Sequence, residues 1–294
     1  MNSFGSRLRE AMDNTGPLCV GIDPHPTLLQ QWGLPDDATG LREFSFRVLE
    51  ATAGQAAAVK PQSALFERLG ARGVAVLAEV VQAARELGTL CIVDAKRGDI
   101  GSTMEGYADA YLSNKSDLAG DAVTLSPYLG FGSLQPALDL ALANDRGVFI
   151  LCLTSNPEGA SVQHAISPYT NNAVAADIAK AAAELNSRGF ETGQSPSSTD
   201  GLPLGSIGLV VGATIGDAVS QTGINLAAVN GPLLAPGVGA QGAGAAELKA
   251  VFGTARPNVL ASSSREILKA GPDLAALRQA TIKSREAVAA ALRD

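Results

Sequence analysis

The sequence predicts an α/β protein, a (β/α)8 TIM barrel that forms a single domain over residues 1–294. Short runs rich in Val, Ile, Leu and Ala alternate with longer segments of helical periodicity, which is typical of successive βαβ units in a parallel sheet. There are eight such runs, the number of strands that closes a barrel. A chain of 294 residues is an ordinary length for one.

The expected strands are spread along the chain with helix-length segments between most of them. They are Leu18–Ile22, Ala56–Lys60, Leu90–Ala95, Ala122–Ser126, Val148–Thr154, Ile207–Gly212, Leu233–Pro236 and Asn258–Ser262. A helical pattern at Ser3–Asn14 is expected to cover the barrel floor, and Pro272–Leu292 supplies the last helix. The Gly-, Ser-, Thr- and Pro-rich segment 187–206 is expected to be an exposed, mobile surface loop without catalytic groups.

Composition and charge exclude several classes of protein. With 46% hydrophobic and 17% charged residues, the chain is globular rather than disordered. The net charge of −7 leaves no basic stripe to neutralise phosphates, so we expect no nucleic-acid partner. No basic segment followed by a long apolar run opens the chain, and no apolar stretch reaches membrane-spanning length. We therefore expect a cytoplasmic protein without a membrane partner, in which an anionic substrate needs a local cationic pocket.

Cysteine and histidine are scarce and form no pattern typical of a metal site. Cys19, Cys91 and Cys152 each fall inside an apolar run, where a free cysteine packs as a small hydrophobe rather than in a disulfide framework. His25 and His164 have no neighbours at ligand spacing and are expected in loops or on the surface. No metal site is predicted.

Charged residues close the third expected strand in the order Asp94, Lys96, Asp99. Successive side chains of a strand point to opposite faces, so Asp94 and Lys96 share a face and Asp99 lies just beyond, on the connection. Functional groups of a barrel gather at such strand ends. The alternative is a structural salt bridge at the sheet rim, but grouping three charges there is costly in desolvation, and this favours an active site.

Polar residues close other expected strands as well. Asp23 follows the first strand, where an aspartate before proline can also be an ordinary turn former. Lys60 closes the second, where a surface lysine lying along apolar neighbours is the alternative. Ser155 is the best single candidate after the fifth strand, and its neighbours Thr154 and Asn156 stay open as alternatives.

The seventh strand runs into a glycine-rich segment, Gly237-Val-Gly-Ala-Gln-Gly242, which matches the G-x-G-x-x-G fingerprint of dinucleotide-binding folds. Those folds place the fingerprint in their opening unit and an acidic residue at the end of the next strand, and neither holds here. Such glycines serve equally well as a phosphate cradle, and barrels frequently bind phosphate after strands seven and eight. Arg265 follows the eighth strand, and its planar guanidinium can donate two hydrogen bonds to a phosphate. The alternative is that Arg265 is a solvated arginine at the start of a helix.

The stretch DAKRGDIGST, residues 94–103, resembles the signature of the orotidine 5'-phosphate decarboxylase family in its longer-chain bacterial branch, type 2. The resemblance covers nearly the whole chain. It implies decarboxylation of orotidine 5'-phosphate to uridine 5'-phosphate and CO2 in de novo pyrimidine biosynthesis, with no metal or organic cofactor. The family's charged tetrad corresponds to Lys60, Asp94, Lys96 and Asp99.

The resemblance also implies substrate contacts. Asp23 would bind the ribose hydroxyls, and Ser155 would read the pyrimidine. Gln241 and Arg265 match phosphate-contacting positions, with backbone N–H groups of Gly239 and Ser264 beside them.

Two further implications concern assembly and movement. Asp99 and Thr103 match positions that reach across the twofold interface of a homodimer into the partner's site. Binding of the remote phosphate would drive closure of the loop around Gly237–Gly244.

The implied reaction explains why the charged residues are needed. Loss of CO2 from C6 of the substrate leaves a carbanion with no adjacent carbonyl or imine to delocalise it, so the site must stabilise it electrostatically. Lys96 is expected to be both the cation beside C6 and the acid that protonates it. Asp94 would lie against the departing carboxylate, and Lys60 and Asp99 would hold the network in register.

Three alternatives remain. A metal-dependent sugar-phosphate decarboxylase of the same barrel superfamily would share the D-x-K-x-x-D core. A nicotinamide-dependent oxidoreductase would use the late glycine fingerprint, with Arg265 on a ribose phosphate. A catalytically inactive nucleotide-binding protein would keep the pocket without the chemistry.

Overall fold

The computed structural model describes residues 2–191, 204–238 and 243–293. Eight parallel strands form a closed barrel in chain order, and the last strand pairs with the first. This confirms the predicted (β/α)8 barrel. The strands are β1 Leu18–Ile22, β2 Ala58–Pro61, β3 Leu90–Arg97, β4 Ala122–Leu125, β5 Gly147–Leu153, β6 Ile207–Val211, β7 Leu233–Pro236 and β8 Val259–Ser263.

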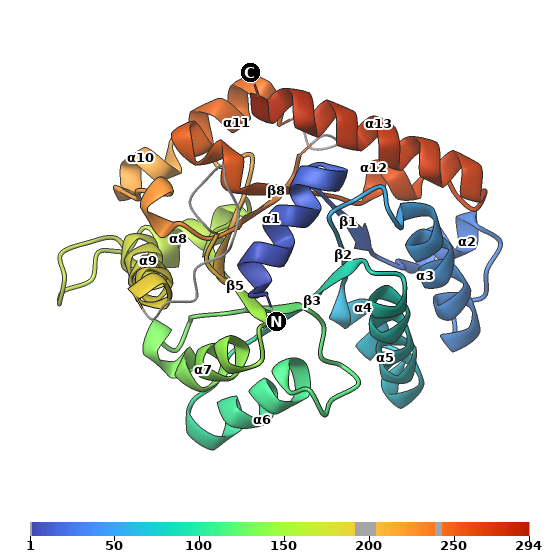
Figure 1. The fold of residues 1–294 in the computed structure, drawn as a ribbon, viewed down its shortest axis with the longest axis horizontal. Coiled ribbons are helices and arrows are strands. Elements are labelled where there is room, and N and C mark those ends of the chain that lie inside the picture. The colour runs from blue at the N-terminus through green and yellow to red at the C-terminus, as the bar shows by residue number, and fades with distance from the viewer. Residues whose placement is uncertain (1, 192–203, 239–242, 294) are drawn as a thin grey trace.

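Helices surround the barrel and cover one of its ends (Figure 1). The longer ones are α1 Phe4–Thr15, α3 Ala38–Thr52, α5 Gly70–Glu86, α6 Gly101–Leu112, α7 Gln135–Ala143, α9 Val174–Glu191, α11 Ala245–Phe252 and α13 Leu274–Arg293. Short helices lie in the connections: α2 Pro26–Gln31, α4 Ser63–Glu67, α8 Ala160–Gln163, α10 Ala218–Thr222, α12 Arg265–Leu268, η1 Phe131–Leu134, η2 Pro157–Gly159, η3 Ala227–Val229 and η4 Gly253–Asn258. None of the helices in the described residues is long and apolar enough to cross a membrane.

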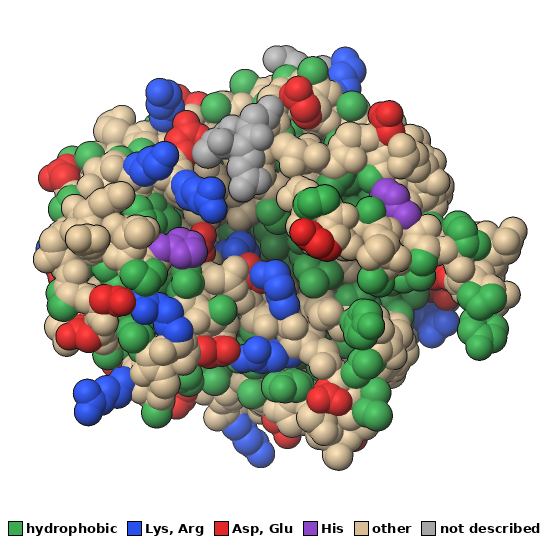
Figure 2. All heavy atoms as spheres, turned by 180° about the vertical axis from the view of Figure 1, so that it is seen from behind, with side chains coloured by type: hydrophobic (Ala, Val, Ile, Leu, Met, Phe, Trp, Pro, Cys, Tyr) green, Lys and Arg blue, Asp and Glu red, His purple; other side chains and the backbone are tan. Residues whose placement is uncertain are grey.

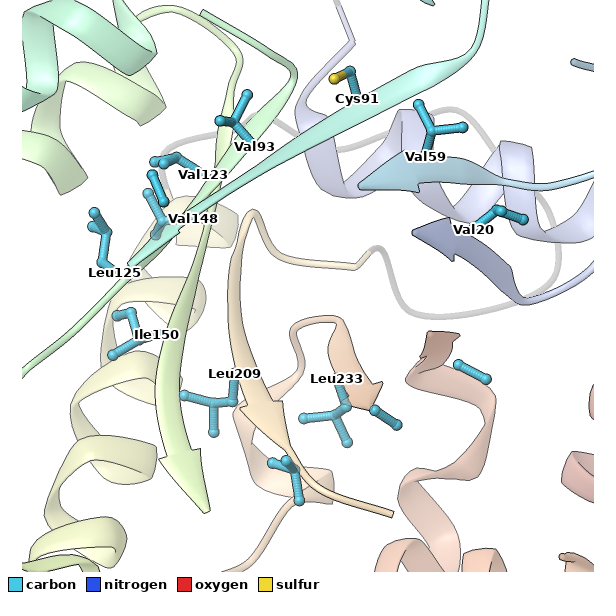
Figure 3. Close-up of a cluster of buried hydrophobic side chains, with 14 of the residues drawn as sticks. Val20, Val59, Cys91, Val93, Val123, Leu125, Val148, Ile150, Leu209 and Leu233 are labelled. Carbon is cyan, nitrogen blue, oxygen red and sulfur yellow. The ribbon is translucent and has the colours of Figure 1, made fainter. Parts of the chain in front are cut away.

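The strands bury apolar side chains on both faces. Those that point outward pack under the surrounding helices in one large cluster, part of which is shown in Figure 3. They include Val20, Val59, Val93, Val123 and Ile150. Because neighbouring residues of a strand point to opposite faces, the side chains between them enter the barrel.

The inward-facing side chains form a second, smaller apolar cluster, which α1 completes. Cys19, Ala58, Ile92 and Phe149 belong to it, together with Phe4, Leu8 and Met12 of α1. Phe4 meets Phe149 edge to face, with ring centroids 6.0 Å apart. The helix therefore covers the barrel floor, as the sequence predicts for Ser3–Asn14, and Figure 1 shows it lying across that end.

The expected segment boundaries are correct for β1 and β7 and are displaced by one or two residues at the other strands. The expectation of a surface loop over 187–206 is wrong at both ends. Helix α9 continues to Glu191, and within it the Ser187 hydroxyl donates to the Glu184 carbonyl at 2.9 Å. At the other end Leu204 and Ser206 are buried, and Ser206 Oγ accepts from the Gly5 N–H at 3.2 Å. The middle, 192–203, lies outside the described residues.

The three cysteines are free and buried, as predicted. Burial raises the pKa of the Cys19 and Cys152 thiols to about 12. These thiols remain protonated at neutral pH and act as small core residues.

Candidate active site

The carboxyl ends of the strands surround a cavity of about 400 Å³. Figure 2 looks at the face opposite that of Figure 1 and shows a hollow there, with lysine and arginine side chains around and inside it. Polar residues from the ends of β1, β2, β3, β5 and β8 line the cavity, and Leu151 of β5 and Val210 of β6 supply apolar wall. Such a cavity suits a ligand with an apolar ring and several polar groups.

Strand periodicity carries Lys60 and Asp94 into the barrel interior. Ala58 of β2 and Ile92 of β3 belong to the inner apolar cluster, and the next side chains on the same faces are Lys60 and Asp94. Each of these two charged residues is only 6% exposed. The barrel interior therefore changes from apolar to charged between two successive inward-facing positions of the same strands.

The Asp94 carboxylate is the centre of the polar network. Its Oδ2 accepts from Lys60 Nζ at 2.7 Å and from Gln62 Nε2 at 3.2 Å. Its Oδ1 accepts from Lys96 Nζ at 2.5 Å and from the Thr124 hydroxyl at 2.8 Å. Four donors thus face the four acceptor positions of one buried carboxylate.

Opposite charges keep this network ionised. Burial opposes the charged form of Lys60, but Asp94 and Asp23 outweigh it and raise the pKa of its ammonium above the usual range. Burial also opposes the charge on Asp94, and the ammonium groups of Lys60 and Lys96 hold the pKa of its carboxyl below the usual range. Lys60 and Asp94 are both charged at neutral pH.

Lys96 differs from Lys60 in exposure and in backbone. Its side chain is 44% exposed and lines the cavity, so its ammonium can meet a ligand. Its backbone φ is +48°, a left-handed conformation that residues other than glycine rarely adopt. The pairing of β3 with β4 is irregular at this point, between Val93 and Arg97. Beyond this irregularity β3 continues to Arg97, two residues past the expected end.

Asp23 and Ser264 also line the cavity, after the paired strands β1 and β8. Asp23 Oδ1 is buried and accepts no hydrogen bond from the described residues, so it is available to a ligand hydroxyl. Gly21 makes room for this arrangement, because a Cβ there would lie 2.0 Å from Ser264 Oγ and 2.8 Å from Asp23 Oδ2.

Thr154, Ser155 and Asn156 all line the cavity after β5. The Thr154 N–H donates to Gln163 Oε1 at 3.0 Å, and its hydroxyl lies 2.7 Å from Asn156 Oδ1. Asn156 Nδ2 donates to Glu158 at 3.2 Å. Within the described part of the chain, Ser155 alone of these three makes no side-chain hydrogen bond.

Arg265 lines the cavity as the first residue of α12 and is exposed. His25 also lines it, from the exposed loop after Asp23 that was expected for it. Gly239 and Gln241, the other expected phosphate contacts, lie outside the described residues, as does most of the loop expected to close. In the ranges that are described, no group of three His, Cys, Asp or Glu side chains could hold a metal ion.

Asp99 and Thr103 do not line the cavity of their own chain. Asp99 is half-buried, and its Oδ1 accepts from the Ile100 N–H at 2.8 Å. Thr103 is exposed on α6. One chain therefore brings together three of the four expected tetrad residues, Lys60, Asp94 and Lys96.

Two members of the network, Gln62 and Thr124, were not predicted from the sequence. Gln62 stands two residues after Lys60, a spacing that places both on one face of an extended segment. Thr124 is the polar residue of a four-residue apolar strand, in line with the inward-facing Ala122. Both signals were present, but each also fits an ordinary turn or strand residue.

Comparisons with known proteins agree with this geometry. Residues 16–280 match the family model described as Orotidine 5'-phosphate decarboxylase / HUMPS family. The orotidine 5'-phosphate decarboxylase of Salinispora arenicola is 56% identical over 280 residues, 95% of each chain, and that of Streptomyces coelicolor is 54% identical over the same share.

Solved structures show the same relation. A crystal structure from Streptomyces avermitilis, provisionally identified as an orotidine 5'-phosphate decarboxylase, superposes with a TM-score of 0.90 at 51% identity, covering 100% of this chain and 97% of that one. The OMP decarboxylase of Leishmania donovani gives a TM-score of 0.74 at 32% identity, with 99% of each chain covered. With sequence, fold and strand-end charges in agreement, we conclude that this chain belongs to the orotidine 5'-phosphate decarboxylase / HUMPS family.

Proposed function

We propose that this chain decarboxylates orotidine 5'-phosphate to uridine 5'-phosphate and CO2, a step of pyrimidine biosynthesis, and that it needs no metal or organic cofactor. The observation that carries the proposal is the buried Asp94 carboxylate held between the ammonium groups of Lys60 and Lys96. Such a network places fixed positive charge at the base of the cavity without help from solvent.

Lys96 is the proposed acid. When the bond between C6 and the carboxylate carbon breaks, the electron pair stays on C6 and CO2 leaves. The exposed ammonium of Lys96 stabilises that pair and then donates a proton to C6, after which solvent returns the proton to the lysine. Asp94 would lie against the substrate carboxylate, so that repulsion between the two anions is relieved as CO2 forms. Lys60 keeps Asp94 ionised and in place.

The remaining groups would bind the nucleotide at a distance from C6. Arg265 and the Ser264 N–H are the proposed phosphate contacts among the described residues, with Gly239 and Gln241 beside them in the glycine segment. The free Oδ1 of Asp23 would accept from a ribose hydroxyl. Ser155 would read the pyrimidine, because its hydroxyl is not occupied by its neighbours.

A homodimer with shared active sites explains the place of Asp99 and Thr103. Both lie outside their own chain's cavity, beside the exposed Ile100. Tyr128 and Leu129, in the loop after β4, are also exposed apolar residues. We propose that a second copy covers this surface and that Asp99 and Thr103 enter its cavity.

The metal-dependent sugar-phosphate decarboxylase is the alternative to be tested, because the family description also includes the HUMPS branch. In this chain both Asp94 oxygens already accept from ammonium groups, so a divalent cation would compete with two positive charges for that carboxylate. The donor set therefore favours the cofactor-free reaction.

The direct test is to mix purified protein with orotidine 5'-phosphate, follow the loss of absorbance and identify the product. Full turnover after dialysis against a chelator, with uridine 5'-phosphate as the product, is the expected result. If the chelator abolishes turnover and a divalent ion restores it, the metal-dependent reaction is the better assignment.

Shared sites have their own test. We expect Lys96→Ala and Asp99→Ala proteins each to be inactive, and to complement when they are refolded together at equal amounts. Random exchange makes about half the dimers mixed, and each mixed dimer has one intact site, so roughly a quarter of wild-type activity should return. Light scattering must first show that mixed dimers form. If they form and stay inactive, Asp99 acts within its own chain.

A further inference from the structure

Among the described residues, Thr124 is the neutral side chain that hydrogen-bonds to both Asp94 and Lys96, the proposed catalytic residues of β3. It is 1% exposed on β4, and its hydroxyl oxygen accepts from the Lys96 backbone N–H at 2.9 Å. The same oxygen lies 2.8 Å from Asp94 Oδ1. Thr124 is absent from the cavity lining, so it acts on a ligand only through other residues.

The direction of these two hydrogen bonds follows from their atoms. The Lys96 N–H can only donate, and an ionised carboxylate can only accept. The Thr124 hydroxyl must therefore receive the first bond and donate its single proton to Asp94. A one-way chain of this kind strengthens each of its members and fixes the rotation of the carboxylate.

The first bond bears on a strained part of the backbone. Lys96 has a φ of +48° where β3 departs from regular pairing with β4. Left-handed conformations of this kind persist only where the surroundings hold them. The hydroxyl of Thr124 satisfies the Lys96 N–H in that conformation, and the Ser126 N–H donates to the Arg97 carbonyl at 2.7 Å just beyond it.

We propose that Thr124 is a positioning residue, whose hydroxyl sets the Asp94 carboxylate and the Lys96 backbone in the arrangement that decarboxylation requires. This inference rests on the proposed function, because it assigns a task to the network that performs it. The hydroxyl is the essential part. Valine would fill the same space among the inward-facing residues but would leave the Lys96 N–H and one Asp94 acceptor position without their partner.

Two matched pairs of variants isolate the hydroxyl. Wild type and Thr124→Val differ in the hydroxyl with the side-chain shape kept, and Thr124→Ser and Thr124→Ala differ in it with the methyl group absent from both. Thr281→Val is the control, since Thr281 is equally buried on α13 and, among the described residues, its hydroxyl bonds only to the Leu277 carbonyl. Each protein is checked by circular dichroism, thermal unfolding and calorimetric binding of uridine 5'-phosphate.

We expect kcat to fall about 10- to 100-fold in each step that removes the hydroxyl, as for loss of a hydrogen bond to a charged group. KM and the affinity for uridine 5'-phosphate should stay within about threefold, because the proposed phosphate and ribose contacts are untouched. Thr281→Val should keep its kcat.

Two results would overturn the proposal while leaving the function intact. One is an active wild type whose Thr124→Val variant keeps full kcat. The other is a Thr124→Ser protein as impaired as Thr124→Ala, which would show that the methyl group and packing decide the effect. A wild type that does not turn over orotidine 5'-phosphate at all would instead overturn the proposed function.

Discussion

The barrel interior has an apolar half and a charged half, which are built from the same strands but have different roles. Near the strand starts, Ala58 and Ile92 pack with Phe4 of α1 in a closed apolar cluster. One inward-facing position further along the same strands stand Lys60 and Asp94, buried to a similar degree but charged and open to a cavity. The apolar half stabilises the fold, and this allows the other half to hold charges whose desolvation is costly.

The largest expected effect comes from removing the exposed cation of the charged half. Lys96→Ala should lower kcat by about 10⁴-fold or more, because it removes both electrostatic stabilisation and the proposed acid. The midpoint of thermal unfolding should move by no more than about 3 °C, since the side chain is only partly buried.

Steady-state kinetics and differential scanning calorimetry measure the two quantities. Lys180→Ala, an exposed lysine on α9, is the control and should change neither. A Lys96→Ala protein that keeps a tenth of wild-type kcat would mean that the charged half works without this cation.

The second prediction concerns a substitution in the apolar half of the interior. Phe4→Ala should lower the free energy of unfolding by about 3 to 5 kcal/mol, because it leaves a cavity against Phe149 at the barrel floor. The kcat of the folded protein should stay within about twofold of wild type, since the charged half is untouched.

Urea unfolding gives the stability, and activity is measured well below the unfolding midpoint. Phe46→Ala serves for comparison. Because Phe46 is only partly buried on α3, this variant should lose less free energy of unfolding than Phe4→Ala. A fall in kcat for Phe4→Ala in fully folded protein would show that the two halves are mechanically coupled.

A smaller effect is expected after β8, where substrate binding rather than chemistry is proposed. Arg265→Ala should lose about 2 to 5 kcal/mol of transition-state stabilisation toward orotidine 5'-phosphate, as for removal of one partner of a desolvated charge pair. Orotidine, which lacks the phosphate, should be turned over at the same low rate by both proteins.

The measurement is kcat/KM for each substrate, with Arg278→Ala on the exposed side of α13 as the control. Equal losses for both substrates would place Arg265 in the chemistry or the fold rather than in phosphate binding.

The smallest effect is expected from pH, because the central pair stays charged over a wide range. The low pKa of Asp94 means that its contribution to stability is present above its unfolded pKa of about 3.9 and is lost as the pH falls below it. The raised pKa of Lys60 means that its contribution is present below about 10.4 and is lost as the pH rises beyond.

The free energy of unfolding is therefore compared between wild type and the double variant Lys60→Met/Asp94→Leu. The difference between the two free energies should be constant within about 0.5 kcal/mol from pH 5 to 9. Below about pH 4 the wild type should lose stability relative to the double variant. A steady slope across the neutral range would mean that one member of the pair titrates there.

The sequence was sufficient for the barrel because its strands are continuous apolar runs, and strand ends have a fixed place in such a fold. That logic also placed Lys60, Asp94 and Lys96 at one site, and the structure confirms that they meet. Their roles, and those of Asp23, Ser155, Ser264 and Arg265, stay predictions.

Other features could not be predicted for physical reasons. Thr124 reads as an ordinary strand residue, and the left-handed turn at Lys96 depends on tertiary contacts that no local pattern records. The composition of 187–206 indicates a loop. In the structure α9 continues to Glu191, and the Ser187 hydroxyl donates to the Glu184 carbonyl within that helix. Asp99 could not be placed in a site by one chain, because the cavity it is proposed to enter belongs to another copy.

The pairing of β1 with β8 has a consequence for biosynthesis of the protein. Leu18 lies beside Ala261, so the sheet cannot close until the last strand has left the ribosome. The same strand carries Ser264 and Arg265 directly after it. The edges of β1 and β7 therefore stay unpaired until β8 is in place, and the same step adds Ser264 and Arg265, the proposed phosphate contacts.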